Sequence, residues 1–230
     1  FADEKQLRIY LQIVMFRFLT VISLLSSWGF AQEDFRSIHQ IELDYNKANF
    51  LEPTFKPLTV PANPIQLRDQ TPAINVFGYH PYWQGTKWQN YNYDVLTTIA
   101  YFSAEASSSG QLTNLHGWPV TDLINKAHSN GVEVVLTVSL FNKTDLETLL
   151  SNATNRNNLI SNLVYEVQRG GADGVNIDFE AFPPSQKSNL VTFVKDLRRT
   201  LRDSIPHGKV TLATPAVDWN SAWDFNALAN

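Results

Sequence analysis

The sequence predicts an α/β chain built around a parallel sheet. Short apolar runs rich in β-branched residues alternate with segments whose apolar residues recur at helical spacing, and glycines and prolines stand between them. Strands that alternate with helices pair in parallel through right-handed crossovers. Two closures fit this pattern, a doubly wound open sheet and an eightfold barrel. The turn Gly78-Tyr79-His80-Pro81 lacks the glycine-rich signature that a doubly wound nucleotide binder usually carries after its first strand.

The predicted strands are apolar runs of the kind that a sheet buries. They cover Ala73–Tyr79, Leu96–Ser103, Val132–Leu140, Asp173–Glu180 and Lys209–Ala216. Three helical stripes lie between these strands, and Gly131, Gly170-Gly171 and Pro183-Pro184 mark helix ends and a helix start. The stripes consist of Val120, Leu123, Ile124 and Ala127; of Leu159, Ile160, Leu163, Val164 and Val167; and of Leu190, Val191, Val194, Leu197 and Leu201.

The N-terminal segment has the pattern of a secretory signal peptide. Met15 precedes Arg17 and a short apolar run, and Ala31 stands at the expected cleavage point. A transmembrane anchor is the alternative, but the apolar run is too short to cross ~30 Å of hydrocarbon. We therefore predict that residues 1–31 are upstream residues plus a signal peptide, Met15–Ala31, and that the protein is secreted or periplasmic, with no stable membrane insertion after cleavage.

A polar segment separates the signal from the first strand. Residues 32–72 show no sustained period and contain Pro53, Pro57, Pro61 and Pro64. This composition predicts a linker or a strap on the domain surface. The predicted α/β domain, or the part of it present here, covers residues 73–230.

Composition narrows the function classes. The chain is 43% hydrophobic, enough for a sizeable core, and its formal net charge of -4 without a basic cluster disfavours a nucleic-acid partner. The lack of cysteine excludes disulfides, thiolate catalysis and cysteine-bound metals. The 5 histidines show no metal-ligand spacing, and we expect most of them at the surface. No metal or cofactor is predicted.

One segment combines strand alternation with acidic side chains. Residues 173–180 read Asp-Gly-Val-Asn-Ile-Asp-Phe-Glu, so Asn176, Asp178 and Glu180 share one face of the predicted strand. A half-exposed strand is the simplest interpretation. Helical segments on both flanks argue against it, because parallel sheets are covered on both faces and buried carboxylates are costly unless paired or functional. Two carboxylates at this spacing lie within about 7 Å, which is compatible with a retaining glycosidase.

This segment resembles the Asp-Gly-x-Asp-x-Asp-x-Glu motif on the fourth barrel strand of glycoside hydrolase family 18, the chitinases and related endo-β-N-acetylglucosaminidases. It departs from the motif only at Asn176, where the family usually has Asp. The resemblance covers about Ala73–Asn230 and implies a TIM (β/α)8 barrel. Such a barrel needs about 250 residues and eight strands. We therefore expect a barrel truncated after about the fifth strand.

The resemblance also implies a reaction. It is the hydrolysis of β-1,4 linkages next to N-acetylglucosamine, in chitin, N-glycans or peptidoglycan, by a retaining mechanism in which the substrate's own acetamido group is the nucleophile. Glu180 would be the general acid and base, with its pKa raised by burial and by Asp178, which would orient the acetamido group. Asn176 can hydrogen-bond Asp178 but cannot share a proton with it, which puts the pH profile in question.

Aromatic residues that follow two of the strands are the predicted sugar-stacking residues. They are Tyr79, Trp83 and Trp219, and core packing is the alternative for each. The family's acetamido-binding Tyr on the sixth barrel strand is not assigned in this chain.

Two other interpretations compete with the enzyme. A non-catalytic, lectin-like relative of the same fold typically loses the catalytic Glu, whereas this chain keeps Glu180. In the second interpretation, the chain is a fragment of the barrel that is inactive on its own.

Overall fold

The computed structural model describes residues 36–50, 60–66, 68, 73–181 and 183–229. The predicted signal peptide, Met15–Ala31, lies outside the described residues. The chain divides into two compact units, Phe1–His39 and Gln40–Asn230, and the second unit contains the sheet. Among the described helices, none is both long and apolar enough to cross a membrane.

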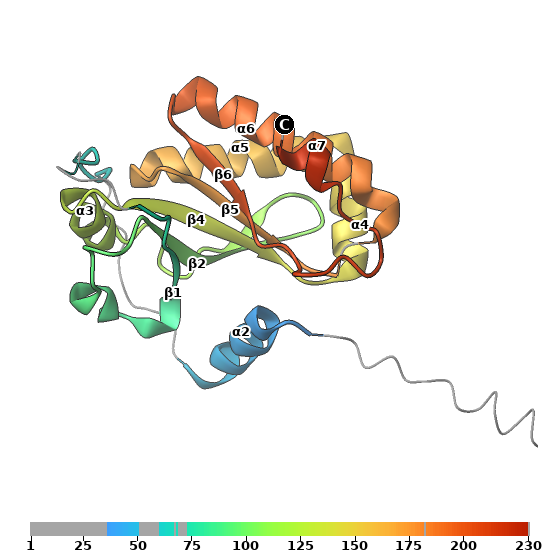
Figure 1. The fold of residues 1–230 in the computed structure, drawn as a ribbon. Helices are drawn as coiled ribbons and strands as arrows, with labels where there is room; N and C mark the ends of the chain where they lie inside the picture. Colours follow the sequence, from blue (N-terminus) through green and yellow to red (C-terminus); the bar gives the residue numbers. More distant parts are fainter. Residues whose placement is uncertain (1–35, 51–59, 67, 69–72, 182, 230) are drawn as a thin grey trace, which may run out of the picture. The chain divides into compact units, whose positions relative to one another are not determined.

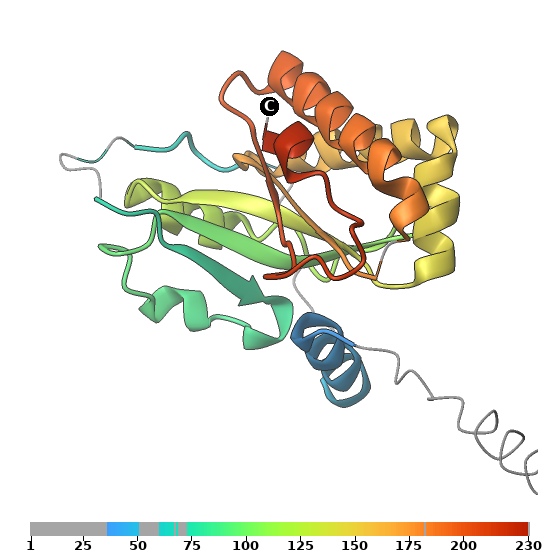
Figure 2. The same cartoon turned by 45° about the vertical axis from the view of Figure 1, so that its right-hand side comes forward.

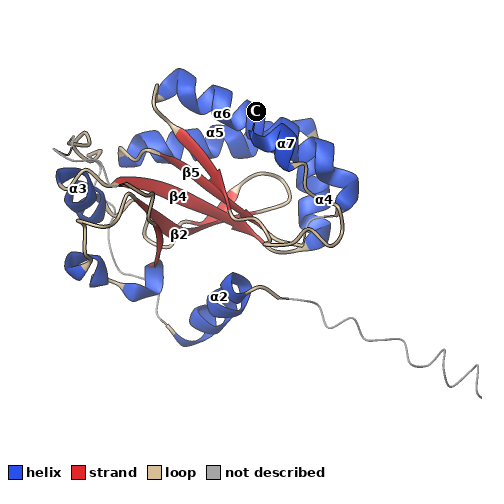
Figure 3. Cartoon of the chain, viewed as in Figure 1, coloured by secondary structure: helices blue, strands red, loops and turns tan. Residues whose placement is uncertain are grey.

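The described strands form one sheet, and all but one of them run parallel (Figures 1 and 3). Its parallel order is β1-β2-β4-β5-β6, and β3 pairs with β2 in the antiparallel sense. This confirms the α/β prediction, and the strand order is that of the first five strands of a (β/α)8 barrel. The strands are β1 (Phe77–Pro81), β2 (Thr98–Ala106), β3 (Leu112–Asn114), β4 (Glu133–Leu140), β5 (Gly174–Phe179) and β6 (Lys209–Leu212).

Helices connect the parallel strands, and α5 and α6 lie side by side over one face of the sheet (Figures 1 and 2). We call this the helix face, and the opposite one the site face. Short 3₁₀ turns, η1 (Tyr82–Gln84), η2 (Lys87–Asn90) and η3 (Pro184–Gln186), complete the connections. The α-helices are α2 (Ile38–Asn49), α3 (Thr121–Ser129), α4 (Lys143–Ser151), α5 (Ala153–Gly170), α6 (Lys187–Ser204) and α7 (Phe225–Ala229).

Local sequence signals fix both ends of α5, the helix that precedes β5. The Asn152 side chain accepts hydrogen bonds from the backbone N–H groups of Thr154 and Asn155, at 2.8 and 3.2 Å, and so caps α5. Gly171, at φ 68°, ends α5 in the left-handed conformation that glycine adopts without steric penalty. The chain therefore leaves the helix at a defined point and enters β5 in a fixed register.

The core lies between the helix face of the sheet and the helices. Val175, Ile177 and Phe179 of β5 are all buried there, and the Phe179 ring stacks on Phe193 of α6 at 5.8 Å between centroids. Burying each such side chain contributes about 1.5–3 kcal/mol. The alternation predicted for this strand is confirmed, because its apolar residues pack against helices and its polar residues point the other way.

Three strand boundaries differ from the sequence predictions by three residues or more. β1 begins at Phe77 rather than Ala73, because residues 73–75 are exposed and pair with no strand. β6 ends at Leu212, short of Pro215, which cannot donate to a sheet ladder. β2 continues past Ser103 to Ala106, and its register shifts between Tyr101 and Ala104. Such a bulge changes which face the following residues occupy.

The segment at residues 60–66 is held at the end of the sheet where the parallel strands begin. Its backbone bonds to Gly170 and His128, and the carbonyl of Asn63 lies 2.5 Å from Nδ1 of His128. Nε2 of the same ring lies 2.8 Å from a carboxylate oxygen of Asp173. Both ring nitrogens thus face oxygen acceptors, an arrangement that favours the doubly protonated, cationic form of the buried ring.

The contacts of His128 with Asn63 and Asp173 make the free energy of unfolding depend on pH. Burial alone would lower the pKa of His128, but the hydrogen bonds to Asp173 and the Asn63 carbonyl, with the charges of Asp173 and Glu133, outweigh it and raise the pKa above its ordinary value. A raised folded-state pKa gives stability that is complete below the unfolded pKa, near 6.5, and lost as pH rises through the folded value.

We therefore expect the melting temperature of the wild type to fall as pH rises from about 6.5 through the folded-state pKa of His128. The fall should be larger than that of the His128→Gln variant over the same range. The substitution itself should destabilise the fold by about 1–3 kcal/mol at acidic pH. Calorimetry of both proteins from acidic to alkaline pH tests this, with exposed His207→Gln as the control. Parallel pH curves for the wild type and His128→Gln would contradict the imidazolium assignment.

Candidate active site

The polar residues of the motif lie where β5 ends, on the site face. Asn176 and Asp178 are buried, at 1% and 0% exposure, and Glu180 follows one residue after the strand and is partly exposed. Asp178 is in register with Ser139 of β4, and Asn176 is in register with Thr137 of β4 and Thr211 of β6. Two carboxylates therefore stand together at the C-terminal edge of a parallel sheet, which is where barrel enzymes carry their chemistry.

Asn176 connects four strands through its amide. Its Nδ2 donates to the Tyr79 hydroxyl of β1 at 3.3 Å and to Thr137 Oγ1 of β4 at 3.4 Å. Its Oδ1 accepts a hydrogen bond from Thr211 Oγ1 of β6 at 2.9 Å. These neighbours are neutral hydroxyls, which can accept from Nδ2 as well as donate to Oδ1, so both ends of the Asn176 amide have partners.

Tyr79, predicted from sequence to bind substrate, lies beside the motif residues. Burial, the negative charge of Asp178 and, to a smaller extent, that of Glu180 raise its pKa to about 12, although the Asn176 hydrogen bond acts in the opposite direction. Phenol ionisation beside two carboxylates is unfavourable. Tyr79 therefore keeps its proton at neutral pH and can act as a hydrogen-bond donor at the site.

Trp83 and Trp219 have different surroundings. Trp83 follows β1 and is half-buried, edge-on to Phe102 at 5.8 Å and to Tyr82 at 4.9 Å, so one part of its ring belongs to an aromatic cluster. Trp219 follows β6 and is 86% exposed. The neighbouring Asp218 carboxylate accepts hydrogen bonds from two backbone N–H groups at 2.9 Å and fixes this turn. The sugar-stacking roles of both tryptophans remain predictions.

A third carboxylate, missed by the sequence reasoning, faces the same side of the sheet. Ala100 pairs with Val135 and Glu105 with Ser139, so β2 contains one residue more than β4 over this stretch. This bulge turns Glu105 to the site face, in one row with Ser139 and Asp178. Uninterrupted alternation would put Glu105 on the face of Tyr101, so the sequence of β2 by itself gives no signal for this placement.

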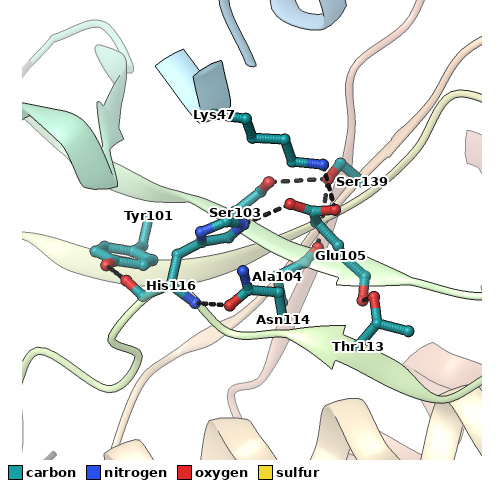
Figure 4. A network of polar contacts seen from close by, with 9 residues as sticks. All are labelled: Lys47, Tyr101, Ser103, Ala104, Glu105, Thr113, Asn114, His116 and Ser139. Atoms are coloured by element: carbon teal, nitrogen blue, oxygen red, sulfur yellow. Dashed lines mark hydrogen bonds and ion pairs between the residues drawn. The ribbon is translucent and has the colours of Figure 1, made fainter. Parts of the chain in front are cut away.

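The charge of Glu105 is balanced by two cations or donors (Figure 4). Nζ of Lys47 and Nε2 of His116 each lie 2.5 Å from one of its oxygens. Burial by itself would raise the pKa of Glu105, but the bonds and charges of His116 and Lys47 lower it below its ordinary value. Glu105 is therefore ionised at neutral pH, so it adds a negative charge to the site face and does not act as a proton donor.

The expectation that most histidines lie at the surface is wrong. His80, His116 and His128 are buried among the described residues, each held by polar or aromatic partners. Tyr82 stacks on His116 at 3.9 Å between ring centroids. Burial lowers the pKa of His80 to about 4, so its imidazole is neutral at pH 7 and bonds the Tyr91 hydroxyl at 2.8 Å. Composition could not reveal these partners, which come from distant parts of the chain.

A parallel α/β sheet of barrel type, with two motif carboxylates at the C-terminal end of its fourth parallel strand, is the arrangement expected of a barrel glycosidase. The sequence profile of the glycosyl hydrolases family 18 matches residues 75–230. The chain therefore belongs to this family. A search among curated proteins finds no match.

Solved structures share the fold at low identity. A chitinase from Bacteroides thetaiotaomicron is 19% identical with a TM-score of 0.55, over 61% of this chain and 46% of that one. The spore cortex-lytic enzyme SleL of Bacillus megaterium is 20% identical with a TM-score of 0.57, over 67% and 39%. A mutant of catalytic domain 2 of the Ostrinia furnacalis Group II chitinase, in complex with (NAG)5, is 20% identical with a TM-score of 0.55, over 67% and 47%.

At these identities the likeness concerns the fold alone. The chain spans half or less of the length of these structures.

Proposed function

We propose that this protein is a secreted glycosidase that hydrolyses β-1,4 linkages next to N-acetylglucosamine, with retention of configuration. The placement of Asp178 and Glu180 at the C-terminal end of β5 carries the proposal, because it puts one fully buried and one partly exposed acidic residue side by side. Family membership and the (NAG)5 complex of a neighbour support the substrate class. The signal-peptide pattern at Met15–Ala31 supports secretion.

In the first step, protonated Glu180 donates its proton to the glycosidic oxygen. As that C–O bond breaks, the carbonyl oxygen of the 2-acetamido group forms a bond to the anomeric carbon of the same sugar, which gives a cyclic oxazolinium ion. Asp178 accepts a hydrogen bond from the acetamido N–H and offsets the positive charge that develops on the ring. The leaving sugar departs with the Glu180 proton.

In the second step, the Glu180 carboxylate takes a proton from water. The water oxygen bonds to the anomeric carbon from the side that the leaving group vacated, and the oxazolinium ring opens to the acetamide. Two displacements at one carbon restore the original configuration. The protonated Tyr79 phenol beside these carboxylates supplies a neutral donor and adds no negative charge to the site.

The acetamido nucleophile makes a specific substrate requirement. We expect the complete gene product to hydrolyse N-acetylglucosamine oligomers and to cleave the matched glucosamine and glucose oligomers at least about 100-fold more slowly, because those sugars lack the internal nucleophile. Chromatographic product analysis at equal substrate concentration measures the ratio. Efficient cleavage of glucose oligomers would contradict substrate assistance, and binding of N-acetylglucosamine oligomers without any hydrolysis would favour the lectin-like alternative.

A further inference from the structure

Helix α2 is docked along one of its sides. Leu43 and Asn46 are 2% and 6% exposed, and Leu43 belongs to the same cluster of buried apolar side chains as the sheet. Lys47 lies on the same side, because residues three and four apart are neighbours on a helix surface. Ile41 and Tyr45 are exposed, so the opposite side of α2 faces solvent.

Lys47 attaches this helix to the site face of the sheet (Figure 4). Its Nζ lies 2.5 Å from an oxygen of Glu105, and the two side chains are 40% and 19% exposed. Glu105 is paired with Ser139, and Ser139 with Asp178, so the three residues form one row across β2, β4 and β5. Two strand spacings separate the ends of this row, which places the Cα atoms of Glu105 and Asp178 about 10 Å apart.

The carboxyl groups of the proposed reaction are partly covered in this state. Asp178 is fully buried, and the buried atoms include Oδ1 of Asp178 and Oε2 of Glu180. Helices α5 and α6 lie over the helix face, so they do not cover these atoms (Figures 1 and 2). The acetamido group and the glycosidic oxygen of a substrate must touch both side chains. The site face therefore has to open before a sugar chain can reach them.

We propose that α2 is an autoinhibitory helix, which Lys47 and Leu43 hold on the site face and which must move away before a sugar chain can extend from Asp178 over β4 and β2. The proposal rests on the proposed function, because the site that α2 restricts is the glycosidase site. When only the open molecules bind substrate, the apparent affinity is reduced by the fraction that is open. Weakening the contacts of α2 therefore improves substrate binding instead of impairing it.

Lys47→Gln in the complete gene product removes the charge and keeps most of the side-chain length. We expect KM for an N-acetylglucosamine pentamer to fall about two- to fivefold, the range of a partly exposed ion pair, with kcat unchanged. Added salt should lower the KM of the wild type but not that of Lys47→Gln, because salt screens the pair and the sugar is uncharged. Lys195→Gln on the exposed face of α6 is the matched control and should keep the wild-type KM.

Leu43→Ala removes the buried anchor of the same helix. We expect KM to fall at least about tenfold, because a buried leucine contributes more than a partly exposed ion pair. Ile41→Ala, at a position 46% exposed on the solvent side of α2, is the control and should leave KM unchanged. A merely structural role of α2 predicts the opposite sign, with a KM at or above that of the wild type in both Lys47→Gln and Leu43→Ala, and that result would overturn the inference.

Hydrogen exchange follows the docking of α2 without turnover. The amides of residues 40–49 should exchange faster in Lys47→Gln and Leu43→Ala than in wild type, while those of β4 and β5 stay unchanged. Unchanged exchange of α2 in both variants would overturn the docking role of Lys47 and Leu43. Hydrolysis with the same KM in all three proteins would overturn the inhibitory role alone. A complete lack of hydrolysis in all three, with faster exchange of α2 in the variants, would instead overturn the proposed function and the inhibitory role with it.

Discussion

Glu180→Gln should lower kcat on N-acetylglucosamine oligomers by at least about 100-fold, because general acid–base catalysis typically supplies 10²–10⁴. Glutamine keeps the size of the side chain at this partly exposed position but can neither donate the proton that the leaving oxygen requires nor accept one from water. Steady-state kinetics of the complete gene product measure the loss.

A leaving-group comparison makes the Glu180 prediction more specific. A 4-nitrophenyl glycoside of the same sugar departs without protonation, so Glu180→Gln should slow the first step less on that substrate than on the oligomer. Glu133→Gln is the matched control, since Glu133 lies at the start of β4, where it bonds Lys209 at 2.6 Å, and should retain wild-type kcat. Equal losses on both substrates would remove Glu180 from the role of general acid.

Asp178→Asn should lower kcat by about 100-fold on both substrates, because the carboxylate opposes the charge of the oxazolinium ion whichever group leaves. Asp178 is fully buried beside Ser139 in the sheet register, so its replacement by an amide of the same shape changes the charge and little else. The same steady-state assays measure this, with exposed Asp122→Asn of α3 as the control.

The two variants together separate proton transfer from charge stabilisation. The loss of kcat caused by Glu180→Gln should depend on the leaving group, and the loss caused by Asp178→Asn should not. An Asp178→Asn enzyme that keeps more than a tenth of wild-type kcat would show that the acetamido group needs no carboxylate partner, and the mechanism would then lose its second residue.

The sequence was most informative where one strong local signal acted alone. The alternation of β5 correctly predicted that Asn176 and Asp178 lie on the same face, and Gly171 correctly predicted where α5 ends. Both signals depend only on a few adjacent residues. The apolar stripe of α6 was equally readable.

Features that depend on partners far along the chain were not readable. The bulge in β2 exists only as a mismatch with β4, so nothing in the β2 sequence announces that Glu105 turns toward the site. Helix α4 has a short, weakly patterned sequence; it begins at Lys143, and the side chain of the preceding Asn142 caps it. Helix α2 lies within the polar segment that was predicted as a linker or strap. The same limit applies to His128, whose charge is set by Asp173 and the Asn63 carbonyl.

The anomer that first leaves the enzyme tests the central claim, a retaining reaction assisted by the substrate at Asp178 and Glu180. Proton NMR of freshly cleaved N-acetylglucosamine pentamer, recorded before the product mutarotates, distinguishes the two forms. We expect the β-anomer of the newly formed reducing end to appear first, because two displacements at one carbon return the original configuration. Initial release of the α-anomer would contradict this mechanism, because it would require direct attack by water in a single displacement.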